Sequence, residues 1–138
     1  MALDFNMPVL VVDDYWTMVR IVRNFLKQLG FCDVDVTQDG HSALEMMHDK
    51  RYGLIISDWH MAPLTGYDLL REVRADRRFA RTPFIMVSGE MNSENIAAAR
   101  KAGLDSYLAK PFNAVTLQSK ILPLFTGGPQ ERFQERVH

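Results

Sequence analysis

Short apolar runs alternate with longer amphipathic stretches along this chain. Each apolar run has the length of a buried strand, and the stretch after it carries apolar residues at helical spacing. Strands are predicted over residues 9–12, 34–37, 54–58, 84–87 and 106–109. Helices are predicted over residues 15–29, after a turn at 39–40, after a loop at 62–66, and over residues 93–102 and 113–125.

Each of four predicted helices has an apolar side that would face a core. In order along the chain, these sides comprise Met18, Val22, Phe25, Leu26 and Leu29; Ala43, Leu44 and Met47; Leu69, Leu70 and Val73; and Val115, Leu117, Ile121 and Leu124 or Phe125. Gly30 and Gly103 are predicted to end the first and fourth helices, since glycine readily adopts the backbone conformation found after a helix. Ser93 is predicted to cap the start of the fourth helix.

Five strand–helix repeats predict an α/β fold with a parallel sheet covered by helices on both faces. Right-handed connections leave few topologies, and the commonest for five units is the flavodoxin-like (βα)5 sheet with strand order 2-1-3-4-5. One domain is expected over residues 1–126. Residues 127–138, which begin Gly127-Gly128-Pro129, are expected to form a polar tail with too few apolar residues to pack firmly.

Composition narrows the class of protein without naming a function. The 138 residues carry a formal net charge of −1, so no global field favours nucleic acid or an anionic membrane. The arginines between residues 71 and 81 are interpreted as a solvated helix face and loop. No apolar run approaches the length of about 18 residues that spans a bilayer, and no signal peptide is recognisable. The single cysteine, Cys32, is typical of a reducing compartment, and a cytoplasmic monomer is expected.

Polar residues stand at the carboxyl ends of four predicted strands. Asp13 and Asp14 follow the first strand, Asp58 closes the third, Ser88 follows the fourth and Lys110 follows the fifth. Open parallel sheets bind ligands at this edge, so three carboxylates, a hydroxyl and an ammonium group are expected to converge. In the predicted order the first and third strands are neighbours, which brings the three aspartates together.

Three neighbouring carboxylates need a counter-charge. At an effective dielectric constant near 20, each pair about 4 Å apart repels by roughly 4 kcal/mol. Oxygen ligands without sulfur favour a hard divalent ion, so Asp13, Asp14 and Asp58 are predicted to bind Mg²⁺. Lys110 and Ser88 would contact phosphoryl oxygens while a carboxylate attacks phosphorus to form an acyl phosphate.

These residues resemble the receiver domain of two-component signalling, and within it the stand-alone chemotaxis response regulators of the CheY type. The resemblance covers the chain from Val9 to about Phe125. It rests on Asp13-Asp14, Asp58-Trp59, Met61, Gly66, Ser88, Tyr107 and Lys110-Pro111-Phe112. Each motif alone is weak, whereas all of them in order at strand ends are specific.

The resemblance implies roles for individual residues. Asp58 would be the phosphoacceptor of a histidine kinase, and Asp13, Asp14 and Asp58 would bind Mg²⁺ together with the backbone carbonyl of His60. Ser88 and Lys110 would contact the phosphoryl group.

Switching would pass from Ser88 to Tyr107, an aromatic residue that turns from an exposed to a buried rotamer. The resemblance also implies a cis peptide at Lys110–Pro111 and an output surface around the fourth helix, fifth strand and fifth helix. The output partner would be a flagellar motor switch protein, and a separate phosphatase would be a further partner.

The loop beside the acceptor departs from the family pattern. His60 and Ala62 replace the residues usual in the family, Pro63 comes one position late, and Thr65 stands where an acidic residue is common. These differences leave the lifetime of the phosphoryl group open.

Three functions compete for this edge of the sheet. The first is a binding switch that catalyses only its own phosphorylation and dephosphorylation, including a phosphate sink or relay intermediate. The second is a Mg²⁺-dependent phosphatase with an aspartate nucleophile, which is disfavoured because His60 stands where such enzymes place an acid. A flavodoxin-like FMN carrier is excluded because Asp13-Asp14-Tyr15 would repel the FMN phosphate, so no organic cofactor is expected.

Simpler readings exist for single residues. Asp13 and Asp14 could cap the first helix, Ser88 could be a turn residue, and Tyr107 could be an ordinary half-buried strand aromatic. Capping alone would leave Asp58 and Lys110 unexplained. Trp59 is expected to be a partly exposed neighbour of the site and a fluorescent reporter.

Overall fold

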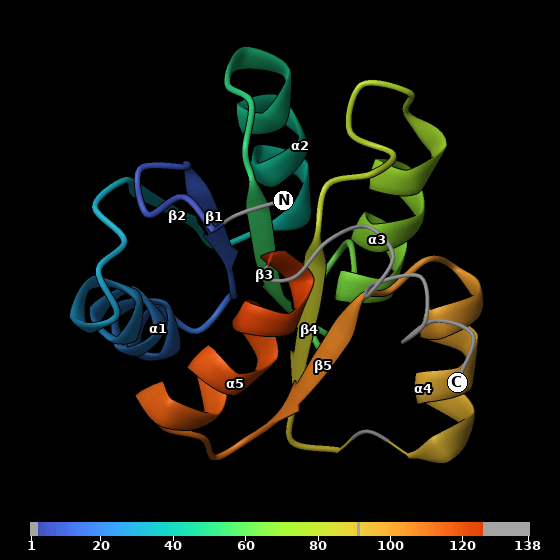
Figure 1. The fold of residues 1–138 in the computed structure, drawn as a ribbon. Helices are drawn as coiled ribbons and strands as arrows, with labels where there is room; N and C mark the ends of the chain where they lie inside the picture. Colours follow the sequence, from blue (N-terminus) through green and yellow to red (C-terminus); the bar gives the residue numbers. More distant parts are fainter. Residues whose placement is uncertain (1–2, 91, 126–138) are drawn as a thin grey trace.

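The computed structural model describes residues 3–90 and 92–125 and shows a parallel five-stranded sheet with the order β2-β1-β3-β4-β5 (Figure 1). The strands are β1 (Val9–Val12), β2 (Val34–Thr37), β3 (Leu54–Asp58), β4 (Phe84–Ser88) and β5 (Ser106–Ala109). The helices are α1 (Trp16–Gln28), α2 (Gly40–Asp49), α3 (Gly66–Ala75), α4 (Ser93–Lys101) and α5 (Ala114–Phe125). The flavodoxin-like prediction is confirmed in class, strand order and strand direction.

Helices cover both faces of the sheet. Helices α1 and α5 lie on one face, and α2, α3 and α4 lie on the other (Figure 1). Strands β1, β3 and β4 are buried along their whole length, which explains why their sequences are apolar without alternation. Side chains of these strands that point to opposite faces join two separate cores, one under each helical layer.

Strand register sets the positions of the polar strand ends. Val12 pairs with Ser57, so Asp13 and Asp58 follow at the same level of the sheet. Asp58 pairs with Val87, and Ser88 pairs with Ala109, which places Lys110 directly beyond the neighbouring strand end. The direction in which successive strands are added to the sheet reverses between β1 and β3. Asp13 and Asp58 therefore lie at the topological switch point, where open sheets bind ligands.

Several local predictions are wrong. The cap of α4 is Asn92, whose side chain accepts a hydrogen bond from the Asn95 N–H, and Ser93 is the first helical residue. Val115 is 73% exposed, so it does not belong to the apolar side of α5. Val19, which the predicted apolar side of α1 left out, is fully buried. Gly40 lies within α2 and is not part of a preceding turn, because Asp39 caps that helix.

The amino-terminal edge of the sheet is held by a largely buried ion pair. The Arg74 guanidinium lies 2.8 Å from the Asp105 carboxylate and also donates to the backbone carbonyls of Thr82 and Gly103. Asp105 in turn accepts a hydrogen bond from the backbone N–H of Phe84 at the start of β4. Arg74 therefore joins α3 to the starts of β4 and β5, and it is not part of a solvated face as the sequence suggested.

A second polar group closes the same edge near β2. Lys50 lies 3.0 Å from Asp33 and 2.9 Å from Asp35, and the Tyr52 hydroxyl donates a 2.6 Å hydrogen bond to Asp35. Burial and this hydrogen bond raise the pKa of Tyr52 well above its usual value. The tyrosine therefore remains a hydrogen-bond donor throughout the physiological pH range.

Among the described residues, no helix is long and apolar enough to cross a bilayer. The predicted tail at residues 127–138 lies outside the described residues, so its boundary stays a prediction.

Candidate functional site

Three carboxylates meet at the carboxyl-terminal edge of the sheet. Asp13 and Asp58 are buried, at 4% and 5% exposure, whereas Asp14 is exposed. One carboxylate oxygen from each residue lies within 4.8 Å of the others. Ligand oxygens on opposite sides of an octahedral Mg²⁺ ion are about 4 Å apart, because each bond is near 2.1 Å. The donor type and spacing therefore fit a hard divalent cation, and the binding of Mg²⁺ itself stays a prediction.

Lys110 reaches into this acidic cluster from the loop after β5. Its ammonium nitrogen lies 2.9 Å from Asp58 Oδ1 and 3.5 Å from Asp13 Oδ2. The Lys110 backbone N–H donates to the carbonyl of Ser88, and this bond anchors the loop on the neighbouring strand end. Burial alone would lower the pKa of Lys110, but the hydrogen bond to Asp58 and the charges of both aspartates raise it. The side chain is therefore a fixed positive charge at the site.

Burial, neighbouring charges and a backbone hydrogen bond act on the Asp13 carboxylate. Burial and the nearby charge of Asp58 raise its pKa, while the N–H of Tyr15 and the ammonium of Lys110 act in the opposite direction. The Tyr15 N–H donates a 2.9 Å hydrogen bond to Asp13 Oδ1. The cap residue of α1 is Tyr15 and no side chain caps this helix, so the simpler capping interpretation is wrong for Asp13. Asp13 accepts from the N–H of the cap residue, and its second oxygen faces Lys110.

Ser88 occupies the end of β4 with only 1% of its surface exposed. Its hydroxyl oxygen accepts a 3.0 Å hydrogen bond from the backbone N–H of Glu90. Because this bond uses an oxygen lone pair, the hydroxyl hydrogen remains a possible donor to another group. Ser88 is therefore a buried strand-end residue, and it also satisfies a turn donor.

Gly66 permits close packing beneath Asp58. A Cβ atom at this position would overlap the backbone oxygen of Asp58 and would lie 2.8 Å from Met86 Sδ and 2.9 Å from Trp59 Cα. The Gly66 N–H also donates to the carbonyl of Trp59. The first residue of α3 must therefore lack a side chain for the acceptor loop to close on the helix.

An aromatic stack borders the site on the side of α3. The rings of Trp59 and Tyr67 are nearly parallel, with centroids 5.5 Å apart, and the Arg71 guanidinium lies 5.9 Å from the Tyr67 ring. Trp59 is half-buried, as predicted. The sequence analysis missed Tyr67 and Arg71, although their spacing of four residues on α3 is the spacing at which helical side chains meet.

Tyr107 is half-buried and packs against the core that lies under α2, α3 and α4. Two cations flank its ring: Arg100 of α4 at 5.9 Å and Lys120 of α5 at 5.2 Å from the ring centroid. The sequence analysis identified the tyrosine but neither cation. These contacts connect Tyr107 to both helices of the predicted output surface.

Two features of the surrounding loops bear on earlier predictions. His60 is exposed, and no histidine joins the acidic cluster among the described residues. The Lys110–Pro111 peptide bond is cis, as the resemblance implied, and the Ala62–Pro63 bond is also cis.

Comparisons with known proteins agree with this geometry. Residues 9–122 match the family described as the response regulator receiver domain. The chain is 43% identical to the chemotaxis protein CheY of Pseudomonas aeruginosa over 119 residues, which cover 86% of this chain and 96% of that protein. It is 40% identical to CheY-3 of Vibrio cholerae over 123 residues, which cover 89% of this chain and 95% of that protein.

Solved structures show the same fold. The structure of the Vibrio cholerae chemotaxis protein CheY4 superposes with a TM-score of 0.82 at 30% identity, covering 87% of this chain and 99% of that one. The receiver domain of a Pseudomonas aeruginosa sensor histidine kinase superposes with a TM-score of 0.76 at 29% identity, covering 85% and 95%. The latter structure contains a magnesium ion coordinated in its active-site cleft.

Proposed function

Because the chain belongs to the response regulator receiver domain family, we propose that it is a phosphorylation-dependent switch of the chemotaxis type. In this proposal Asp58 accepts a phosphoryl group from a histidine kinase, and the modified protein changes its affinity for a protein partner. The observation that carries the proposal is the position of Asp58. It is buried at a strand end, 2.9 Å from Lys110 and beside two further carboxylates.

Charge balance supports a divalent metal at the proposed site. Three carboxylates against one ammonium group leave two formal negative charges, and two of these carboxylates are buried. Asp13, Asp14 and Asp58 would hold Mg²⁺, and the backbone carbonyl of His60 would complete the protein ligands. When bound, Mg²⁺ supplies charge neutralisation and orientation for phosphoryl oxygens. The magnesium-containing receiver domain of the sensor kinase is consistent with this assignment.

The proposed chemistry is transfer of a phosphoryl group between two protein side chains. A carboxylate oxygen of Asp58 attacks the phosphorus of a phosphohistidine, and an acyl phosphate forms on Asp58. The P–N bond breaks, and the imidazole is the leaving group. Lys110, which pairs with Asp58 in this structure, would turn its ammonium toward a phosphoryl oxygen once that carboxylate is phosphorylated. Hydrolysis of the mixed anhydride by water returns free Asp58 and inorganic phosphate.

Switching would follow from what the phosphoryl group can attract. In the structure Ser88 accepts from the Glu90 N–H, so its own hydrogen can be donated to a phosphoryl oxygen. Movement of Ser88 toward the site would free space that Tyr107 enters from its half-buried position. Tyr107 would then shift relative to Arg100 and Lys120, which changes the surface made by α4 and α5.

The phosphodonor and the output partner are proposed from the chemotaxis relatives of this chain. A histidine kinase would supply the phosphoryl group, and a flagellar motor switch protein would bind the output surface, since the relatives are chemotaxis proteins. A role as phosphate sink or relay intermediate uses the same site, and only partner binding distinguishes it from motor control.

Acetyl phosphate with Mg²⁺ tests the proposed chemistry. We expect one phosphoryl group per chain by intact mass, and none on Asp58→Asn. Trp59 fluorescence should be quenched, and Trp16→Phe removes the signal of the second tryptophan, which is 46% exposed. Turnover of many equivalents of a phosphate ester without a stable change in partner binding would contradict the switch and favour a phosphatase.

A pull-down that compares beryllofluoride-treated with untreated protein tests the output. We expect a protein retained only by the treated form, and the Asp58→Asn variant should retain it in neither condition. Equal retention by both forms would contradict phosphorylation-dependent output.

A further inference from the structure

A groove of about 730 Å³ lies at the amino-terminal edge of the sheet, at the opposite end of the strands from the acidic cluster. Its lining combines apolar side chains of Met7, Ala80, Pro83 and Phe125 with the aromatic ring of Tyr52. This volume is within the range of roughly 300–1,000 Å³ that is usual for ligand-binding sites. The groove is therefore large enough to hold several side chains of a peptide segment.

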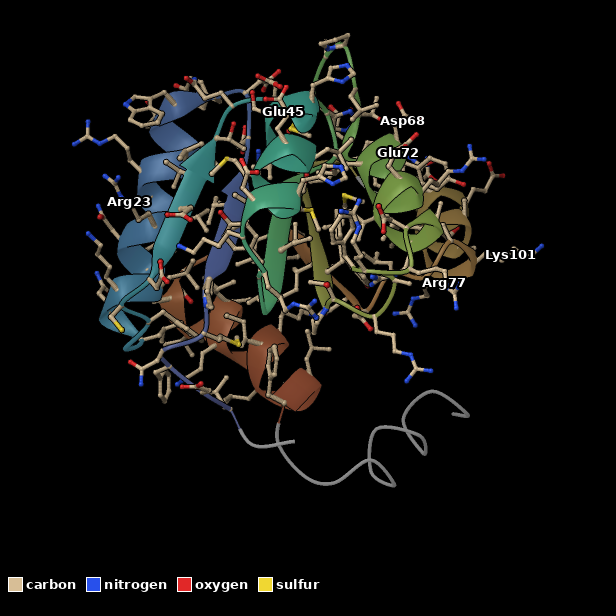
Figure 2. The ribbon with its side chains drawn as sticks, turned by 90° about the horizontal axis from the view of Figure 1, so that it is seen from above. Arg23, Glu45, Asp68, Glu72, Arg77 and Lys101 are labelled. Carbon is tan, nitrogen blue, oxygen red and sulfur yellow. The ribbon has the colours of Figure 1, made fainter. Side chains whose placement is uncertain are left out.

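Arginines surround this apolar lining. Arg51, Arg77, Arg78 and Arg81 are all exposed, whereas Asp4 supplies the only carboxylate among the described residues of the lining. Arg78 pairs with Asp76, but none of the other three forms an ion pair with the described part of the chain. Figure 2 shows Arg77 directed away from the sheet. The groove thus offers an apolar floor with a strongly positive rim, which is complementary to a segment that carries both carboxylates and apolar side chains.

We propose that this groove binds residues 126–138 of the same chain. The described part of the chain ends at Phe125, which itself lines the groove, so residues 126–138 start at its wall. Gly127-Gly128-Pro129 is a turn-forming sequence that would redirect the chain across the groove. Beyond this turn an extended chain advances by about 3.3 Å per residue, so Glu131 and the residues after it could reach the arginine rim.

The sequence of this segment alternates in a way that suits the groove. In an extended backbone, successive side chains point to opposite sides. One side would carry Glu131, Phe133, Glu135 and Val137, and the other side would carry Arg132, Gln134, Arg136 and His138. The first side pairs two carboxylates and two apolar residues with the arginine rim and the apolar floor. The segment has too few apolar residues to pack firmly by itself, and the groove would supply it with arginines and apolar side chains.

Binding at this place would leave the acidic edge of the sheet accessible. The groove adjoins the starts of β3 and β4, at Gly53 and Pro83, whereas Asp58 and Ser88 end the same strands. Phosphorylation of Asp58 should therefore proceed equally with and without the bound segment, and a failure of either proposal is recognised separately.

Amide chemical shifts of the full chain test the proposal. Combining Glu131→Lys, Phe133→Ser and Glu135→Lys should shift the amide signals of groove residues Gly53, Ala80 and Thr82. The control combines Arg132→Gln with Gln134→Ala on the other side of the extended segment and should leave these signals unchanged. Shifts confined to residues 126–138, or equal shifts in both variants, would overturn the proposal. Groove shifts that appear only at high protein concentration would overturn it too, because they would assign the groove to a second copy.

Trypsin cleavage after Arg132 provides an independent readout. If the segment is bound about ten times as often as it is free, cleavage should be about tenfold slower than in the Arg77→Glu, Arg81→Glu variant. Adding Glu131→Arg and Glu135→Arg to that variant should restore protection by reversing both partners. Rapid cleavage of the natural chain, at the rate of the variant, would contradict binding. The variants should all accept a phosphoryl group on Asp58.

Discussion

Carboxylates at the two ends of the parallel sheet differ in how many cationic partners they have. At the amino-terminal edge, Asp105 has Arg74 at 2.8 Å, Asp33 and Asp35 share Lys50, and Asp35 also accepts a hydrogen bond from the Tyr52 hydroxyl. At the carboxyl-terminal edge, Asp13, Asp14 and Asp58 lie close to one another, and among the described residues the one cation that pairs with this cluster is Lys110, through Asp13 and Asp58.

The difference separates charges that hold the fold from charges that bind a ligand. A buried carboxylate that faces a guanidinium and a backbone N–H has its hydrogen bonds satisfied within the protein. A buried carboxylate that faces two others has a deficit that only a cation or proton relieves. The side chains of Asp58 and Asp105 are similarly exposed, at 6% and 7%, so burial alone would not have identified the site. The ratio of carboxylates to cations identifies it.

Substituting Asp58 should have the largest effect. Asp58→Asn removes the attacking oxygen and one proposed metal ligand, so covalent phosphorylation should be lost completely, as measured by intact mass after acetyl phosphate treatment. The matched change at the other edge, Asp35→Asn, should retain phosphorylation. Retained modification of Asp58→Asn would place the acceptor elsewhere.

Breaking the buried pair at the amino-terminal edge should chiefly reduce stability. Arg74→Met leaves Asp105 buried without its guanidinium, so the free energy of unfolding in urea should fall by about 3–5 kcal/mol. Arg78→Met removes an exposed pair with Asp76 and should leave stability unchanged within error. Equal losses for the two variants would mean that burial does not distinguish these pairs.

A side chain at Gly66 should disturb the acceptor edge through packing. Gly66→Ala forces the Asp58 carbonyl, Met86 and Trp59 apart, so unfolding in urea should become easier by about 2 kcal/mol. Gly89→Ala is the control, because its Cβ would meet nothing closer than 4.0 Å. A variant as stable as its control would show that the loop after β3 adapts without cost.

The smallest effect is expected from Tyr52→Phe. Loss of the hydrogen bond to Asp35 should reduce stability by about 1 kcal/mol at neutral pH. Burial raises the pKa of Asp35, but the hydrogen bonds from Tyr52 and Lys50 outweigh burial and lower it. A lowered folded-state pKa stabilises above the unfolded pKa, and this contribution disappears as pH falls through the folded value.

The free energy of unfolding should therefore differ most between Tyr52→Phe and the natural protein at neutral pH. This difference should shrink at acidic pH, below the ordinary aspartate pKa of 3.8. Thermal unfolding at several pH values measures it. A difference that grows on acidification would contradict the role of the ionised Asp35.

Caps and exposed positions were the least predictable features of the fold. Asn92 and Ser93 are both good cap residues, and only the backbone path of the loop after β4 selects the first. Val115 has the apolar character of a core residue, yet its place near the start of α5 turns it to solvent. Such errors of one position arise because local preference is similar at neighbouring residues, whereas the direction of a side chain is not.

The sequence by itself determined the order of strands and helices and the identity of the polar residues at the strand ends. Both follow from local rules, since apolar runs, helical spacing and strand ends are properties of neighbouring residues. Asp13, Asp14, Asp58, Ser88 and Lys110 could therefore be predicted to meet once a parallel sheet was inferred.

Only the tertiary structure decided which charges have partners. Arg74 and Arg78 belong to the same run of arginines, but one contacts Asp105, 31 positions away, and the other pairs with a neighbour two positions away. The stack of Trp59 on Tyr67 and the cations beside Tyr107 arise in the same way. These contacts depend on the relative placement of elements, which side-chain packing sets and residue spacing along the chain does not encode.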